Sequence, residues 1–154
     1  MLLKIKDKAP IISIPDESGK IFSWKDYEGK KVALFFYPKD NTPGCTQEAC
    51  NLRDNYTILK NAGIEVVGIS VDTERKHSNF INKYSLPFRL LADVEHKVVN
   101  DYGVWGEKKL FGVKYMGIFR TTFLVNEKQI IIGIIDKVET GNHANQILEI
   151  FKSI

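Results

Sequence analysis

Two thiols are the side chains of this sequence best suited to covalent chemistry. Cys45 and Cys50 are its only cysteines, and Cys45 directly follows the run Thr42-Pro43-Gly44. A thiolate is a nucleophile and a redox centre, whereas a neutral thiol reacts slowly. The chemistry of the chain therefore depends on whether its fold favours the ionised form of either sulfur.

The residues around Cys45 predict a strand followed by a helix. Residues 31–37 form an apolar run typical of a buried strand, which Pro38 ends because proline cannot donate to a sheet. Pro43 suits a first helical turn, and apolar residues recur at helical spacing over residues 44–61. Cys45 would then lie at a helix start, where free N–H groups and the helix dipole stabilise an anion.

The spacing of the two cysteines argues against a disulfide within an intact helix. Five helical residues give about 7.5 Å of rise and about 140° of rotation, so the Cα atoms of Cys45 and Cys50 would lie about 8.6 Å apart. A disulfide needs about 4.4–6.8 Å between Cα atoms. If the two sulfurs join, the first turns of this helix must unwind.

Other uses of the thiols are less favoured. A cysteine is most often a small buried hydrophobe, and this alternative applies more to Cys50 than to Cys45. A metal site is not expected, because the three histidines (His77, His96 and His143) show no ligand spacing around the two cysteines. The sequence also lacks a Gly-rich nucleotide loop and any haem or flavin motif, so we expect no cofactor.

Length and composition narrow the class of protein. A chain of 154 residues with 44% hydrophobic residues predicts one domain over residues 1–154 with a sizeable core. A net charge of +3 is too small for a nucleic-acid arm. The N-terminus has no signal-peptide pattern, and apolar runs such as 130–135 are too short to span a bilayer. We therefore expect a cytoplasmic protein with neither nucleic acid nor membrane as partner, and a redox or catalytic use of its thiols.

Periodicity and turn residues predict the remaining elements. They are an N-terminal hairpin (11–14 with 20–24), a helical turn (24–29), strands (64–71, 88–91, 118–125 and 129–136) and helices (74–84, 93–102 and 142–153). Asp72 and Asp93 are expected to cap the helices that follow them. Residues 104–117 are rich in glycine and aromatic residues, have no clear period, and are expected to form a loop or a loose extended segment.

The sequence also resembles a known family. Pro38-x-x-x-Thr42-x-x-Cys45 is similar to the active-site motif of the peroxiredoxins, and residues 37–50 resemble their PrxQ branch, also called bacterioferritin comigratory protein. The likeness covers nearly the whole chain. Further similar blocks are Gly68-Ile-Ser-Val-Asp72, residues 80–93, Tyr102-Gly-Val-Trp-Gly-Glu107 and Arg120-Thr-Thr-Phe-Leu124. The family's Gly-His-Ala pattern is spread by one residue, so no role is assigned to His143.

The resemblance implies a thioredoxin-like α/β fold of peroxiredoxin type, with a central mixed sheet, flanking helices and an N-terminal hairpin. In the reaction that it implies, a Cys45 thiolate attacks a hydroperoxide and becomes a sulfenic acid. Arg120, Thr42 and the helix amides would stabilise the negative charges. Pro38 would exclude water, and Glu48 would orient Arg120. From local sequence alone, Thr42 could equally be a helix cap, Arg120 a surface ion-pair partner and Pro38 a strand end.

The resemblance further implies that Cys50 resolves the sulfenic acid by forming a disulfide. Thioredoxin or a similar dithiol protein would then reduce this disulfide, in a monomer that serves antioxidant defence. Three alternatives stay open. A thioredoxin-like thiol-disulfide exchanger would favour a Cys-x-x-Cys spacing, a cysteine hydrolase would need a histidine base, and a redox sensor or chaperone would use the same thiol without turnover.

Overall fold

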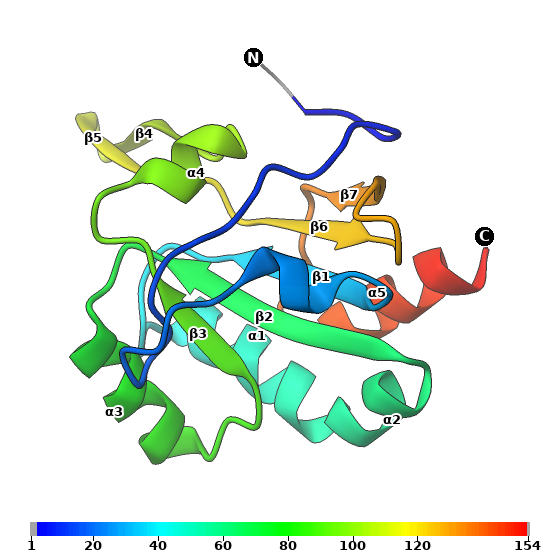
Figure 1. Cartoon of the computed structure of the whole chain (residues 1–154). Coiled ribbons are helices and arrows are strands. Elements are labelled where there is room, and N and C mark those ends of the chain that lie inside the picture. Colours follow the sequence, from blue (N-terminus) through cyan, green and yellow to red (C-terminus); the bar gives the residue numbers. More distant parts are fainter. Residues whose placement is uncertain (1–2, 154) are drawn as a thin grey trace.

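The computed structural model describes residues 3–153, and a five-stranded sheet forms its centre (Figure 1). Its strands are β1 (Lys31–Phe36), β2 (Ile64–Ser70), β3 (Arg89–Ala92), β6 (Thr121–Val125) and β7 (Ile131–Ile135). They lie in the order β3-β2-β1-β6-β7. β1, β2 and β3 are parallel, whereas β6 and β7 are antiparallel to their neighbours. The predicted mixed sheet is therefore confirmed.

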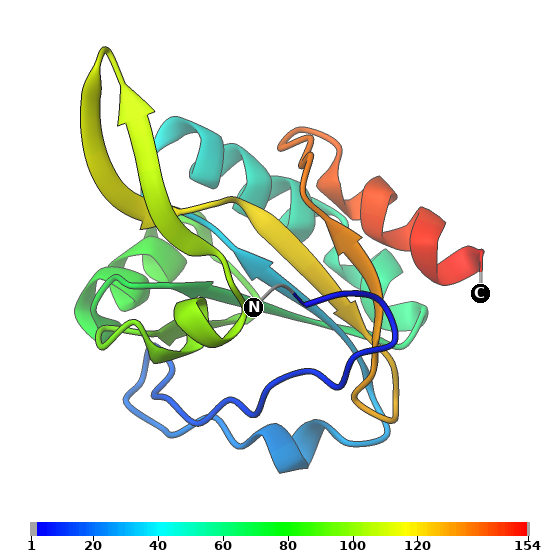
Figure 2. The same cartoon turned by 90° about the horizontal axis from the view of Figure 1, so that it is seen from above.

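Helices cover both faces of this sheet. They are η1 (Trp24–Tyr27), α1 (Pro43–Asp54), α2 (Tyr56–Asn61), α3 (Glu74–Tyr84), α4 (Lys97–Asp101) and α5 (His143–Lys152). Residues of α1, α2, α3 and α5 share one apolar cluster with the sheet, and the N-terminal segment, η1 and α4 share the other (Figures 1 and 2). In residues 3–153, no helix combines the length and the apolar character needed to cross a bilayer.

β1 has the apolar composition that a central strand requires. Residues 32–36 are at most 1% exposed, and Phe35 and Phe36 belong to different clusters. Successive side chains of a strand point to opposite faces, so a strand covered on both sides is apolar throughout. This explains why β1 and β2 could be predicted from uninterrupted apolar runs.

The helix predicted over residues 44–61 is instead two helices, α1 and α2. The break lies at Asn55, whose φ and ψ of −107° and 13° leave the helical region. Its side-chain Nδ2 donates to the carbonyl of Asn51 at 2.8 Å. Asparagine competes with the helix for backbone groups in this way, and periodicity alone does not reveal it.

Several predicted helix ends and turns also differ. Asp72 does not cap α3, because Thr73 is the N-cap and accepts from the Lys76 amide. α4 begins only at Lys97, although Asp93 Oδ2 does accept from the Val99 amide at 2.8 Å. The predicted N-terminal hairpin contains a tight turn and an isolated bridge between Pro15 and Ile21, but no strands.

For residues 104–117 the loop alternative was wrong, and the segment is extended and regular. This segment forms a second sheet, the hairpin β4 (Trp105–Leu110) and β5 (Val113–Ile118). The hairpin projects away from the body of the molecule (Figure 2). Most of its side chains are at least partly exposed, so it lacks the alternation of apolar and polar residues that identifies a half-buried strand.

Candidate functional site

Cys45 lies in the first turn of α1, as the sequence predicted. Thr42 is the N-cap of the helix, Pro43 is its first residue, and the cysteine is only 2% exposed. The helix starts where the chain leaves the carboxyl end of β1, so a short loop holds the thiol against the edge of the central sheet. Both cysteines are free thiols.

Arg120 reaches the Cys45 sulfur from another part of the sheet. Its Nη2 donates to Sγ at 3.4 Å. β6 runs antiparallel to β1 and pairs Thr121 with Phe36, so the residue before β6 emerges beside the end of β1. Gly44 makes room for this approach, because a Cβ there would lie 3.1 Å from Nη2. The guanidinium group and the helix N-terminus thus place positive electrostatic potential beside the sulfur.

Glu48 holds the other side of the guanidinium. It lies one turn beyond Cys45 on α1, is fully buried, and accepts from Arg120 Nη1 at 2.6 Å. Burial raises the pKa of Glu48 to about 7, although the charge and hydrogen bond of Arg120 act in the opposite direction. Arg120 thus bridges a buried carboxyl group and the thiol, the arrangement that the family resemblance implied for Glu48.

His143 lies behind Glu48, and sequence reasoning gave it no role. Its Nε2 is 3.5 Å from Glu48 Oε2, which has no hydrogen-bond partner among residues 3–153. The same Nε2 is 2.7 Å from the hydroxyl of Thr122 on β6. Burial lowers the pKa of His143, so its ring is neutral at pH 7. When Nδ1 carries the ring hydrogen of the neutral imidazole, Nε2 can accept a hydrogen bond from the Thr122 hydroxyl.

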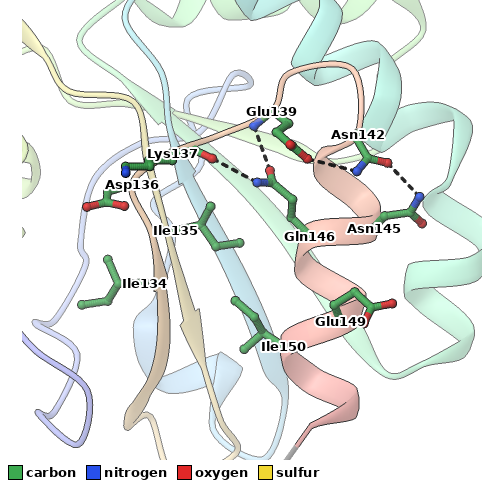
Figure 3. Close-up of a pocket in the computed structure, with 10 residues that line it drawn as sticks. All are labelled: Ile134, Ile135, Asp136, Lys137, Glu139, Asn142, Asn145, Gln146, Glu149 and Ile150. Atoms are coloured by element: carbon green, nitrogen blue, oxygen red, sulfur yellow. Dashed lines mark hydrogen bonds between the residues drawn. The ribbon is translucent and has the colours of Figure 1, made fainter.

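The hydrogen bonds of Gln146, in a groove between β7 and α5, explain this tautomer of His143. Gln146 Nε2 donates to the carbonyl of Lys137, and its Oε1 accepts from the amide of Glu139 (Figure 3). These two hydrogen bonds assign the orientation of the Gln146 amide, with its oxygen at Oε1. His143 Nδ1 lies 2.8 Å from this oxygen, so Nδ1 carries the ring hydrogen and donates it. The groove is lined by Ile134, Ile135, Asp136, Lys137, Glu139, Asn142, Asn145, Gln146, Glu149 and Ile150. Neither cysteine lines the groove, and its link to the site is Gln146, which contacts His143 Nδ1.

Among residues 3–153, three other residues expected at the site form no hydrogen bond with the sulfur. The Thr42 hydroxyl donates to the carbonyl of Lys39 at 2.8 Å, so it acts within its own loop. Pro38 is half-buried in the same loop, two residues after the end of β1. Cys50 is half-buried five residues along α1 from Cys45, in a continuous helix. The structure therefore brings Arg120 and Glu48 together with Cys45, while Thr42, Pro38 and Cys50 stand nearby.

A second buried polar cluster lies under the loop that precedes α1. His77 of α3 contacts Asp40 Oδ2 through Nδ1 at 2.6 Å and the carbonyl of Leu91 through Nε2 at 2.8 Å. The Tyr37 hydroxyl donates to Asp40 Oδ1, and the Asp40 amide donates to Asp72. Ligand atoms of Asp40, Asp72 and His77 lie within 4.8 Å of one another. Both ring nitrogens of His77 are already hydrogen-bonded, so the cluster holds the loop in place.

Comparison with known proteins agrees with this geometry. The sequence matches the AhpC/TSA family over residues 5–134. It is 46% identical over 148 residues to the putative peroxiredoxin bcp of Coxiella burnetii, which covers 96% of this chain and 98% of that protein. Peroxiredoxin Bcp of Escherichia coli is 45% identical over 150 residues, 97% of this chain and 96% of that one.

Solved structures give the same result. A mutant of Xylella fastidiosa PrxQ superposes with a TM-score of 0.92 at 26% identity, over 99% of this chain and 98% of that one. The bacterioferritin comigratory protein of Xanthomonas campestris, studied for its alkyl peroxide reduction activity, has a TM-score of 0.86 at 28% identity. That match covers 92% of this chain and 90% of the other.

The chain belongs to the AhpC/TSA family and is a peroxiredoxin, an enzyme that reduces peroxides. Within this family it falls in the Bcp branch, whose solved members are called PrxQ or bacterioferritin comigratory protein. The family and the thioredoxin-like fold that the resemblance implied are thus confirmed.

Proposed function

We propose that Cys45 is the peroxidatic thiol of this enzyme and that Arg120 and Glu48 form its electrostatic support. The observation that carries the proposal is the bridge formed by Arg120, whose two terminal nitrogens contact Cys45 Sγ at 3.4 Å and Glu48 Oε1 at 2.6 Å. This geometry holds a fixed cation beside the sulfur before any substrate binds. Hydrogen peroxide and organic hydroperoxides are the proposed substrates.

In the first step the Cys45 thiolate attacks the terminal oxygen of the hydroperoxide. A sulfur–oxygen bond forms and the oxygen–oxygen bond breaks, so the sulfur becomes a sulfenic acid and the other oxygen leaves as an alkoxide or hydroxide. The sulfur is oxidised by two electrons and the peroxide is reduced by two. Arg120 and the amides at the start of α1 stabilise the charge that moves to the leaving oxygen, which then takes a proton. Thr42 and Pro38 shape the loop around the reacting atoms.

In the second step the Cys50 thiol condenses with the sulfenic acid, releasing water and forming a disulfide. A dithiol protein such as thioredoxin then reduces this disulfide and restores both thiols. Such a cycle requires a reducing compartment, so we place the enzyme in the cytoplasm, acting as a monomer in antioxidant defence. No metal or cofactor takes part in the proposed cycle.

The test is peroxide consumption with a thioredoxin system, measured for the wild type and for two variants. We expect Cys45→Ser to be inactive, because it removes the nucleophile. Cys50→Ser should consume one equivalent of peroxide, accumulate a sulfenic acid that dimedone traps, and turn over poorly. Full activity of Cys45→Ser would overturn the assignment of the nucleophile, and normal turnover of Cys50→Ser would overturn the proposed disulfide. Hydrolysis of esters without peroxide consumption would favour a cysteine hydrolase.

A further inference from the structure

The β4–β5 hairpin carries apolar side chains that neither the core nor the cysteine site uses. At its tip Leu110 is 56% exposed, Phe111 is 97% exposed and Val113 is 65% exposed. Figure 2 shows that the hairpin projects from the molecule. Leu110 pairs with Val113 in its register, so residues 110–113 form its turn and its outer end. Clustered apolar side chains in such a position mark surfaces that bind something else. We call Leu110, Phe111 and Val113 the apolar tip.

The backbone conformation of the turn at the tip is unfavourable for Phe111. Phe111 and Gly112 have φ values of 51° and 80°, so the two-residue turn has the positive φ values of type I′. This turn favours asparagine, aspartate or glycine at its first position, and a bulky aromatic residue is disfavoured there. With 97% of its surface exposed, the Phe111 ring gains almost no packing in return. Neither backbone preference nor internal packing explains this residue.

The strands directly behind the tip carry positive charge. Lys109 lies opposite Lys114 in the register of the hairpin. Like charges in directly opposed positions destabilise a pair of strands, so this pair also has no benefit for folding. The hairpin, residues 105–118, has three lysines against one glutamate, a net charge of +2. Its third lysine, Lys108, donates to the carbonyl of Ile118 at 2.8 Å, so the charge behind the tip comes from Lys109 and Lys114.

We propose that the apolar tip docks this protein on an anionic lipid surface. In this arrangement Leu110, Phe111 and Val113 enter the acyl boundary, while Lys109 and Lys114 lie at the level of the phosphate groups. Apolar side chains inserted among headgroups and lysines beside them are the two interactions that hold peripheral proteins on anionic membranes. The half-exposed Tyr115 extends the amphipathic character behind the tip.

The size and shape of the tip favour a lipid surface over a protein partner. A specific protein interface buries about 800 Å² on each side and needs a complementary shape. Three side chains on a narrow turn, with Tyr115 and Met116 half-exposed behind them, do not supply a face of that area, whereas a bilayer accepts them without a preformed pocket. The sequence-based expectation of no membrane partner rested on the lack of a spanning segment, and surface docking requires none.

Vesicle sedimentation with the full chain tests the proposal. We expect the wild type to bind vesicles of phosphatidylglycerol and phosphatidylcholine in equal parts, to bind pure phosphatidylcholine vesicles much more weakly, and to dissociate as salt screens the lysines. Phe111→Asn should weaken binding roughly tenfold or more, because it removes the aromatic ring that enters the membrane in the bound state. Asparagine suits the turn, so this variant should unfold at the same temperature as the wild type or higher.

The lysines are tested by a double variant with matched controls. Lys109→Gln with Lys114→Gln should weaken binding to the anionic vesicles on the order of thirtyfold, at about 1 kcal/mol for each lysine. Lys60→Gln with Lys152→Gln removes the same charge from exposed positions elsewhere and should have a much smaller effect. Ile11→Asn removes a side chain that is 76% exposed outside the hairpin and should leave binding unchanged.

Three results would overturn the proposal. The first is a wild type that does not sediment with anionic vesicles. The second is a Phe111→Asn variant that binds them as well as the wild type. The third is light scattering that shows a dimer of the wild type, dissociated by Phe111→Asn, without vesicle binding; the tip would then contact a second copy of the chain.

Discussion

At the scale of single residues, Arg120 makes contacts at the site that depend on the shape of its guanidinium group. It offers Nη2 to Cys45 Sγ and Nη1 to Glu48 Oε1 from one rigid guanidinium plane. A lysine has the same charge, but its single ammonium group lacks the fixed fork that spans both partners. The site therefore depends on the shape of this cation as well as on its charge.

We accordingly expect Arg120→Lys to slow the reaction of Cys45 with peroxide by about a hundredfold, the usual effect of losing one preorganised donor. The rate constant can be measured by competition with a peroxidase of known rate. Arg75→Lys, which changes an exposed arginine of α3, is the matched control and should react like the wild type. An Arg120→Lys variant as fast as the wild type would show that charge alone is sufficient.

The raised pKa of Glu48 predicts that the free energy of unfolding depends on pH. Burial raises the pKa of Glu48 from 4.5 to about 7, so the folded state holds this proton more tightly than the unfolded chain. The stabilisation is complete below pH 4.5, declines as the pH rises, and is lost above about pH 7, amounting to about 3 kcal/mol in total. Arg120, His143 and Cys45 are the other charged or titratable groups around this carboxyl group.

Glu48→Gln should remove this dependence. Urea unfolding of both proteins at about pH 5 and about pH 8 gives the difference in unfolding free energy at each pH. The lowered pKa of His143 acts in the opposite direction, and because its main cause is burial, which both proteins share, it largely cancels in that difference. A difference that is the same at both pH values would mean that Glu48 titrates alike in the folded and unfolded states.

At the scale of elements, the continuous helix α1 separates the two thiols. Cys45 and Cys50 both lie within its twelve residues, Pro43–Asp54. Five helical residues hold their Cα atoms about 8.6 Å apart, beyond the reach of a disulfide. The break at Asn55 ends α1 before α2 begins, so the unwinding that the proposed disulfide requires can stop there.

We expect the disulfide form to have lower helicity than the reduced form, measured by far-ultraviolet circular dichroism. Amide hydrogen exchange should be faster in the first turns of α1 and unchanged in α2, because the break at Asn55 isolates the second helix. Cys50→Ser treated with peroxide cannot form the bond and should keep the spectrum of the reduced protein. Identical spectra for reduced and disulfide wild type would exclude an opening of α1.

At the scale of the whole molecule, the Asp40–His77 pair joins the carboxyl ends of three parallel strands. Asp40 follows β1, its amide donates to Asp72 after β2, and His77 Nε2 meets the carbonyl of Leu91 in β3. Carboxyl ends of parallel strands share one edge of a sheet, which is also where α1 begins. The buried pair therefore connects the cysteine loop to the rest of the sheet.

We expect His77→Phe to lower the free energy of unfolding by about 3–5 kcal/mol, because it leaves the Asp40 carboxylate buried without its partner. Adding Asp40→Asn should cost less than the sum of the two single changes, with a coupling of about 1–3 kcal/mol by urea unfolding. Lys97→Gln breaks an exposed pair with Asp101 and should cost under about 1 kcal/mol. Strict additivity of the two buried changes would contradict the pairing.

The hairpin β4–β5 shows where sequence patterns reach their limit at this scale. Its strands stand outside the core, so no buried face imposes a period of two on residues 105–118. β1 and β2 were predictable for the opposite reason, since the core covers both of their faces and requires apolar residues throughout.

What the sequence determined by itself is local. The apolar run of β1, the prolines at positions 38 and 43 and the stripe along α1 were enough to predict Cys45 at a helix start, because neighbouring residues carry that information. The tertiary structure alone decided which distant groups meet there. Arg120 lies 75 residues from the thiol and was expected only from the family resemblance, and His143 behind Glu48 was not expected at all. Such contacts depend on the order of strands in the sheet and on the packing of α5, and no local pattern records them.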